Sequence, residues 1–210
     1  CSQSRGLGDV YKRQLYRRSE AAGGTPELHI GPATHLQWWP EAQTVLLRFF
    51  DQHLKQVQTG QSQLQLWDLG TKQWTSRPRP SALSWSLQGE GLACLDPASG
   101  RLNPNEAGVG EERIIHDPWR PVPAIGGHLS PSSGPADRQS LDARSDVATF
   151  TTAPLDEPIA LSGQPQLQIR AGADQPGFDL CLVLSRLPQG SAAVEQLSSG
   201  VLRVLGAEAE

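Results

Sequence analysis

An apolar stripe with three- and four-residue spacing is the clearest pattern in the chain, between residues 41 and 57. Its members are Val45, Leu46, Phe49, Phe50, His53, Leu54 and Val57. This spacing predicts an amphipathic helix, and Pro40 suits its first turn because an N–H there would have no partner. Asp51 and Lys55 have the spacing of an i,i+4 ion pair on the other side. We expect the apolar face of this helix to pack against a sheet.

Short alternating or β-branched runs occupy most of the remaining chain. The first, residues 28–30, ends at Gly31-Pro32, and from Gln63 onward such runs recur between clusters of Gly, Pro, Ser and Asp. The later runs are residues 64–69, 83–87, 146–152, 159–161, 167–169, 178–184 and 200–205. Many short strands without helices between them predict an antiparallel β-sandwich or jelly roll. The pattern therefore predicts a mainly β protein, in which a strand–loop–helix segment precedes a sandwich.

Composition supports this interpretation and excludes two classes of partner. The chain of 210 residues has 21 Gly and 17 Pro, which is typical of a turn-rich protein. Its net charge is −4, and the first 18 residues are basic, so the body is more acidic than the total suggests. An acidic body repels phosphate backbones, and no apolar run approaches the ~20 residues of a membrane span. We therefore expect neither nucleic acid nor a membrane as a partner.

The N-terminal segment has the character of a non-native tail. The chain contains no Met, and residues 4–14, SRGLGDVYKRQ, resemble a translated sequencing adapter. We therefore set residues 1–14 aside and expect the chain to be a fragment of a longer protein. The predicted organisation is a tail at residues 1–14, a segment of an α/β domain at 15–60 and a β-sandwich at 61–210.

Sites for a metal or an organic cofactor are not indicated. Cys1, Cys94 and Cys181 are few and far apart, so their spacing predicts neither a disulfide framework nor a metal cluster. His116, Asp117 and His128 lack paired ligand spacing as well. Residues 108–110, Gly-Val-Gly, do not open a helix after a strand, so a dinucleotide-binding loop is not expected.

His35 is the principal candidate for catalysis. It lies in HIGPATHLQWWPE, on a loop that follows a predicted strand and precedes the predicted helix. An α/β-hydrolase carries its general base on such a loop, after the Ser and the Asp or Glu in chain order. A role in packing the loop explains the same spacing, so the residues alone leave both interpretations open.

Several ordered motifs resemble the CocE/NonD family of serine hydrolases. Gly31-Pro-Ala-Thr-His35, with Trp38 and Trp39 and the Arg48–Lys55 helix, resembles the end of that family's catalytic domain. Later motifs resemble its C-terminal jelly-roll, or galactose-binding-like, domain. They are DPWRPVP at residues 117–123, Gly126-Gly127, and residues 137–139, 141–144, 146–155 and 159–163.

This resemblance implies roles for three residues. His35 corresponds to the base of a Ser-Asp-His triad, which acts on a small ester, amide or peptide substrate without a metal or organic cofactor. Trp38 and Trp39 flank His35 and are candidates for lining the substrate pocket. The motif departs from the family at Ala33, where Trp is usual, which places the pocket wall beside His35 in doubt.

Two members of the triad have no counterpart in the sequence. Gly-x-Ser-x-Gly is absent, since Ser62 and Ser199 lack the flanking glycines. Asp9 is the sole Asp before His35 and belongs to the tail that was set aside. We therefore expect the isolated chain to be inactive. The alternative is a stand-alone galactose-binding-like sandwich without catalysis, in which His35 is a linker residue. The sequence carries no signal for the oligomeric state.

The predicted boundary has a direct test in limited proteolysis of the isolated chain. We expect a protease to remove residues 1–60 first, because the helix at 41–57 lacks a sheet to cover its apolar face. The order of cleavage is read by mass spectrometry of the fragments. Equal resistance along the whole chain would contradict the boundary.

Overall fold

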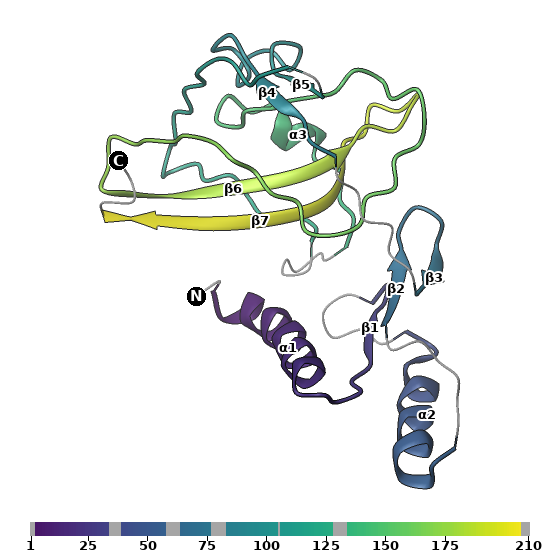
Figure 1. Cartoon of the computed structure of the whole chain (residues 1–210). Helices are drawn as coiled ribbons and strands as arrows, with labels where there is room; N and C mark the ends of the chain where they lie inside the picture. Colours follow the sequence, from purple (N-terminus) through teal and green to yellow (C-terminus); the bar gives the residue numbers. More distant parts are fainter. Residues whose placement is uncertain are drawn as a thin grey trace. The chain divides into compact units, whose positions relative to one another are not determined.

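A computed structural model of the chain describes residues 3–33, 39–57, 64–76, 83–104, 106–127 and 134–206 (Figure 1). The chain forms two compact units, Cys1–Arg79 and Pro80–Glu210. Each unit is built around its own sheets.

The first unit contains a β–α–β arrangement. Strand β1 (Leu28–Ile30) pairs in parallel with β2 (Leu64–Asp68), and helix α2 (Ala42–Lys55) lies between them in sequence. Two neighbouring parallel strands require a crossover connection, and a helix usually provides it. Strand β3 (Gln73–Thr75) then pairs antiparallel with β2, so the sheet order is β1-β2-β3.

Helix α2 confirms the prediction made from the apolar stripe. It begins after Glu41 and ends where Gln56 adopts a left-handed conformation, with φ 58°. The Lys55 ammonium lies 2.6 Å from the Asp51 carboxylate, which is the expected i,i+4 pair. The large apolar side chains of the stripe are mostly exposed, namely Leu46, Phe50, Leu54 and Val57, and Leu47 beside them is exposed too. The helix therefore presents an apolar face that nothing in the described residues covers.

The first unit extends beyond residue 60, where the sequence analysis placed its end. Leu64 and Leu66 pair with Leu28 and Ile30, so β2 belongs to the sheet of β1 rather than to a sandwich. A period-two pattern identifies a strand but not its partner, which is why the sequence placed β2 in the following domain.

A short turn explains the unpredicted strand β3. The Asp68 carboxylate accepts hydrogen bonds from the N–H groups of Gly70 and Thr71, at 2.8 and 2.9 Å, and these bonds lower the pKa of Asp68. Lys72 has a left-handed φ of 54°, which reverses the chain into β3.

Helix α1 (Gln3–Ala21) passes through the segment that was set aside as a tail. Its C-terminus is a Schellman motif, in which Gly23 has a φ of 81°. The N–H of Gly23 bonds to the carbonyl of Glu20, and the N–H of Gly24 bonds to that of Ser19. The sequence analysis did not predict this helix, because residues 1–14 were excluded from it.

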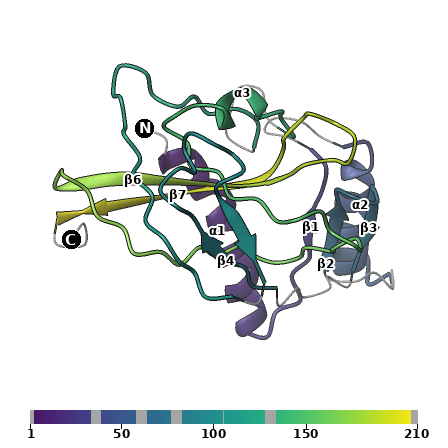
Figure 2. The ribbon, with the colours of Figure 1, turned by 90° about the horizontal axis from the view of Figure 1, so that it is seen from above.

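The second unit is assembled from narrow antiparallel pairs. Strands β4 (Ser86–Gln88) and β5 (Arg101–Asn103) form one pair, and β6 (Gly177–Arg186) and β7 (Glu195–Leu205) form a long hairpin (Figures 1 and 2). Val109 adds a parallel bridge beside β4, and Thr151 adds one beside β5. Gly100 allows this last approach, since a Cβ there would overlap the Thr149 carbonyl oxygen.

The predicted strands have mixed outcomes. Strands β6 and β7 confirm the runs at 178–184 and 200–205, and β4 lies at the end of the run at 83–87. The run at 146–152 forms no regular strand, but Thr151 bridges to Arg101 and the Thr149 N–H bonds to the Ala93 carbonyl at 3.0 Å. The runs at 159–161 and 167–169 form no regular strand, and Pro158 and Pro165 precede them without an N–H to donate. The mainly β class is confirmed, while the complete jelly roll stays a prediction.

A buried polar cluster joins helix α3 (Gln139–Asp142) to β7. The Arg138 guanidinium donates to Gln196 Oε1 at 3.1 Å and to Asp142 Oδ1 at 3.2 Å, and both Arg138 and Gln196 are buried. Burial raises the pKa of Asp142, and the nearby Arg138 charge partly offsets that effect. Backbone bonds reinforce the junction, because the Arg138 N–H reaches the Val194 carbonyl at 2.8 Å.

Replacement of Arg138 tests this junction. In Arg138→Met the apolar stem remains, but the buried Gln196 and the half-buried Asp142 lose their partner, so we expect a loss of about 3 kcal/mol in the free energy of unfolding. Urea unfolding of the isolated chain measures it. Arg203→Met is the matched control, because the Arg203–Asp179 pair is exposed and its loss should leave the urea midpoint unchanged. Equal effects of the two variants would contradict the assigned role of Arg138.

Candidate functional site

The candidate site is the loop that follows β1 at the carboxyl end of this strand. In α/β sheets, ligands bind beside the carboxyl ends of the parallel strands, so this is the expected edge for catalysis. The structure describes the loop as far as Ala33 and again from Trp39. His35 and Trp38, two of the predicted site residues, lie outside the described residues.

Both described ends of the loop contact a tryptophan cluster formed by Trp39, Trp67 and Trp74. A Cβ on Gly31 would lie 3.0 Å from Trp74 Cη2 and 3.1 Å from Trp39 Cε3, so a larger residue would crowd both rings. The ring centroids of Trp39 and Trp74 are 5.9 Å apart, and those of Trp67 and Trp74 are 5.5 Å apart. Such tilted and edge-on arrangements are the favourable ones for aromatic pairs. The cluster therefore fixes the two ends of the loop close to each other.

Trp39 contributes to the packing at the base of the loop. Its ring is half-buried between Gly31 and Trp74, and its Nε1 atom is buried without a hydrogen-bond partner among the described residues. A buried indole N–H normally donates to a hydrogen-bond acceptor. The Trp39 N–H could therefore donate to an acceptor outside the described residues. The predicted role of Trp39 in lining a substrate pocket stays a prediction.

His29 and Glu27 form a pair that the sequence analysis missed. The imidazole Nε2 lies 3.3 Å from Glu27 Oε2, and both side chains are largely buried. The His29 ring also meets Trp74 edge-on, with centroids 6.3 Å apart. The sequence did carry a signal for this pair. Glu27 and His29 are two residues apart at a strand, and this spacing places their side chains on the same face.

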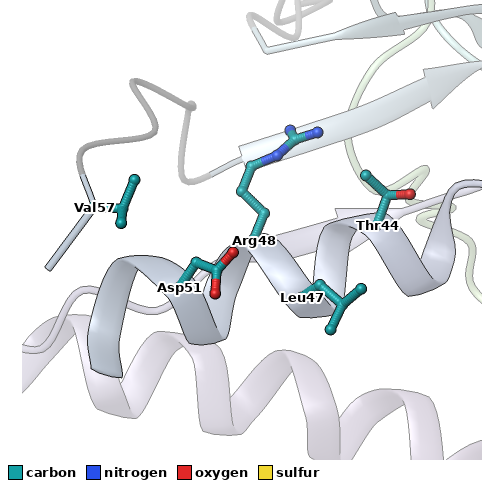
Figure 3. A pocket seen from close by; sticks show the side chains of 5 residues that line it. All are labelled: Thr44, Leu47, Arg48, Asp51 and Val57. Atoms are coloured by element: carbon teal, nitrogen blue, oxygen red, sulfur yellow. The ribbon is translucent and has the colours of Figure 1, made fainter. Parts of the chain in front are cut away.

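A hollow of about 390 Å³ lies beside α2 (Figure 3). Its lining residues are Thr44, Leu47, Arg48, Asp51 and Val57. Among the described residues, this lining contains a guanidinium and a carboxylate but no Ser, Cys or His. The described part of the lining therefore offers neither the Ser nor the His of the predicted triad.

The described residues contain no group of three or more His, Cys, Asp or Glu side chains that could hold a metal ion. His116 and Asp117 were considered as metal ligands. Within the described residues, no third His, Cys, Asp or Glu side chain joins them in such a group. In the same part of the chain, no helix is long and apolar enough to cross a membrane.

The DPWR turn of the second unit is held by an arginine–aspartate pair. The Asp117 carboxylate accepts the Trp119 N–H at 2.9 Å, and the Arg120 N–H reaches the Asp117 carbonyl at 3.0 Å. Arg144 Nη2 donates to the Arg120 carbonyl at 2.5 Å. Arg144 also donates two hydrogen bonds to the Asp146 carboxylate, from Nε to Oδ1 at 2.7 Å and from Nη2 to Oδ2 at 2.6 Å. Two motifs that are separate in sequence, residues 117–120 and 144–146, therefore form one network.

Comparison with known proteins identifies the family. The model of the X-Pro dipeptidyl-peptidase C-terminal non-catalytic domain matches residues 23–206. The chain belongs to this family. It is also 29% identical, over 178 residues, to the cocaine esterase of Rhodococcus sp. (strain MB1 Bresler), a match that covers 78% of this chain and 30% of the esterase. The chain thus spans about 30% of the length of that relative.

These matches confirm the resemblance that the motifs indicated. The chain is a C-terminal part of a CocE/NonD family protein, and the family domain is a β-sandwich, in agreement with the mainly β class. The matched range begins at residue 23, after α1, and includes both the β–α–β arrangement and the DPWR turn.

The Arg144–Asp146 pair predicts a sensitivity to acid. Hydrogen bonds from Arg144 hold the pKa of Asp146 below its ordinary value, so the pair stabilises the fold above about pH 4 and loses this contribution as the pH falls through the folded-state pKa. In Asp146→Asn, the unfolding free energy should therefore fall less steeply with acidification below about pH 4 than in the parent chain.

Urea midpoints measured at pH 6 and pH 3 give this slope. Asp156→Asn, at an exposed bend, is the control and should retain the slope of the parent chain. Identical slopes for the parent chain and Asp146→Asn would show that the pair does not stabilise the fold.

Proposed function

We propose that the chain is the C-terminal part of a serine hydrolase that cleaves ester or amide bonds, with His35 as its general base. The observation that carries this proposal is the parallel pairing of β1 with β2 across α2. This arrangement is typical of an α/β domain, and the motif Gly31-Pro-Ala-Thr-His35 begins at the carboxyl end of β1. Family membership and the likeness to cocaine esterase support the same class of reaction.

The chemistry follows from the roles of a Ser-Asp-His triad. The Ser hydroxyl attacks the carbonyl carbon while His35 accepts its proton, and the imidazolium then returns the proton to the leaving group. A carboxylate holds the second ring nitrogen in the donor form throughout. In the second half of the reaction, a water molecule attacks the acyl-enzyme carbonyl while His35 accepts its proton, and the imidazolium then returns a proton to the Ser oxygen. The Ser and the carboxylate are proposed to lie upstream of this sequence, because the chain order in this fold places them before the His.

The second unit would support catalysis without taking part in it. The apolar face of α2 would be covered by the upstream strands of the catalytic domain, as expected for a helix in an α/β layer. Ester, acyl amide and X-Pro peptide substrates are all compatible with this part of the protein.

The test requires the gene with its upstream coding region. We expect the complete polypeptide to hydrolyse an aryl ester, an acyl amide or an X-Pro anilide. In His35→Ala, kcat/KM should fall by roughly 10⁴-fold or more, because triad members act as a unit. His116→Ala, at an exposed position in the second unit, is the matched control and should retain activity.

Two outcomes would overturn the proposal. Wild-type turnover in His35→Ala would show that this His is not the base. An upstream region that encodes neither a Gly-x-Ser-x-Gly segment nor a carboxylate loop would instead favour a stand-alone binding sandwich.

A further inference from the structure

Trp119 is the most exposed of the large hydrophobic side chains in the described part of the chain. Its exposed fraction is 92%, and that of Ile115 in the same segment is 76%. Ile114 and Val122 are also exposed, so four apolar side chains lie at the surface within nine residues. We call these four residues the Trp119 ridge. Clustered apolar side chains at a surface are characteristic of a contact site, whereas single ones are ordinary.

The backbone of the ridge is held in place at residues 117–120, around Trp119, although the Trp119 side chain is exposed. Asp117 fixes the turn through the N–H of Trp119, and Arg144 fixes the carbonyl of Arg120. Pro118, Pro121 and Pro123 restrict the same stretch further. A fixed backbone means that little conformational entropy would be lost when the indole ring is buried by a partner. Trp residues presented in this way are frequent hot spots of protein interfaces.

The anchor of the ridge belongs to the second unit. Arg144 and Asp146 follow α3 in the chain, and their side chains are mostly buried. The adjacent segment reaches β5 through the bridge between Thr151 and Arg101. The ridge is therefore attached to the folded second unit through these contacts.

We propose that the Trp119 ridge is the surface on which the upstream catalytic part of the same polypeptide docks. This inference rests on the proposed function. The occupant follows from two findings: the family domain is described as C-terminal and non-catalytic, and the chain matches only 30% of its esterase relative. Most of such a protein lies outside this chain, and a non-catalytic domain of a single polypeptide needs a contact with that remainder. An apolar recess on the catalytic part would receive the indole ring.

Hydroxyl-radical oxidation followed by mass spectrometry tests the docking. The 210-residue chain is compared with the complete polypeptide that includes the upstream coding region. We expect oxidation of Trp119 to be at least about tenfold slower in the complete polypeptide, at every protein concentration, because a hot-spot ring is shielded from solvent. Equal rates would overturn the proposal. Protection that appears only as the concentration rises would overturn it too, in favour of a second copy.

A pair of variants provides an independent readout. Trp119→Ala should lower the thermal midpoint of the complete polypeptide by about 4 °C or more and leave that of the 210-residue chain unchanged. Leu95→Ala is the matched control, because Leu95 is also 71% exposed in the second unit but lies on another turn. No shift for Trp119→Ala in the complete polypeptide, or equal shifts for both variants, would contradict the docking role.

The His35→Ala assay separates this inference from the proposed function. Hydrolysis that depends on His35, together with full oxidation of Trp119, would refute the docking surface alone. Protection of Trp119 without any hydrolysis would support the docking surface while the proposed reaction fails.

Discussion

Parallel pairing of β1 with β2 is the constraint on which the first unit depends. Two parallel strands side by side cannot be joined by a tight turn, so the chain between them must cross over the sheet. Helix α2 provides that crossover, and the segment between β1 and α2 is thereby placed at the carboxyl end of the strand. The family motif occupies this segment. A short pairing of three residues therefore determines where the described start of this motif, residues 31–33, lies in the first unit.

The second unit relies on polar junctions as much as on apolar packing. Arg138 joins α3 to β7, and Arg144 joins the DPWR turn to the segment that leads to Thr151. Within the described residues, the buried apolar side chains of this unit are small in number and include Ala93 and Leu141. Charged groups that are removed from water stabilise a fold only when their partners are in place. Such a unit is specific in its geometry and sensitive to the loss of a single partner.

The sequence predicted the elements with strong local signals. Pro40 and the apolar stripe located α2 to within two residues at each end, and short alternating runs marked most of β6 and the second half of β7. The three-residue strand β3 was missed, because it depends on the turn at Asp68 and on pairing with β2. The runs at 159–161 and 167–169 were predicted as strands from their short alternating or β-branched pattern, and the structure contains no regular strand there.

At the candidate site, too, the sequence indicated the local motif but not the contacts between residues far apart in the chain. A motif read along the chain singled out His35, with Trp38 and Trp39 beside it. No local pattern could show that Trp74 packs against Gly31 and Trp39, because this contact depends on the sheet order β1-β2-β3. The arginine network at the DPWR turn was likewise hidden, because Arg144 and Arg120 are 24 positions apart in the chain.

The tryptophan cluster has a consequence for the exchange of domains between relatives. Trp74 belongs to β3, which follows α2 in the chain, yet its ring sets the space available at Gly31. A chimera joined directly after the helix would bring a foreign β3 to the base of the loop and impose a different ring on it. Hybrid proteins should therefore be joined after Arg79, so that the loop and the strand that supports it are inherited together.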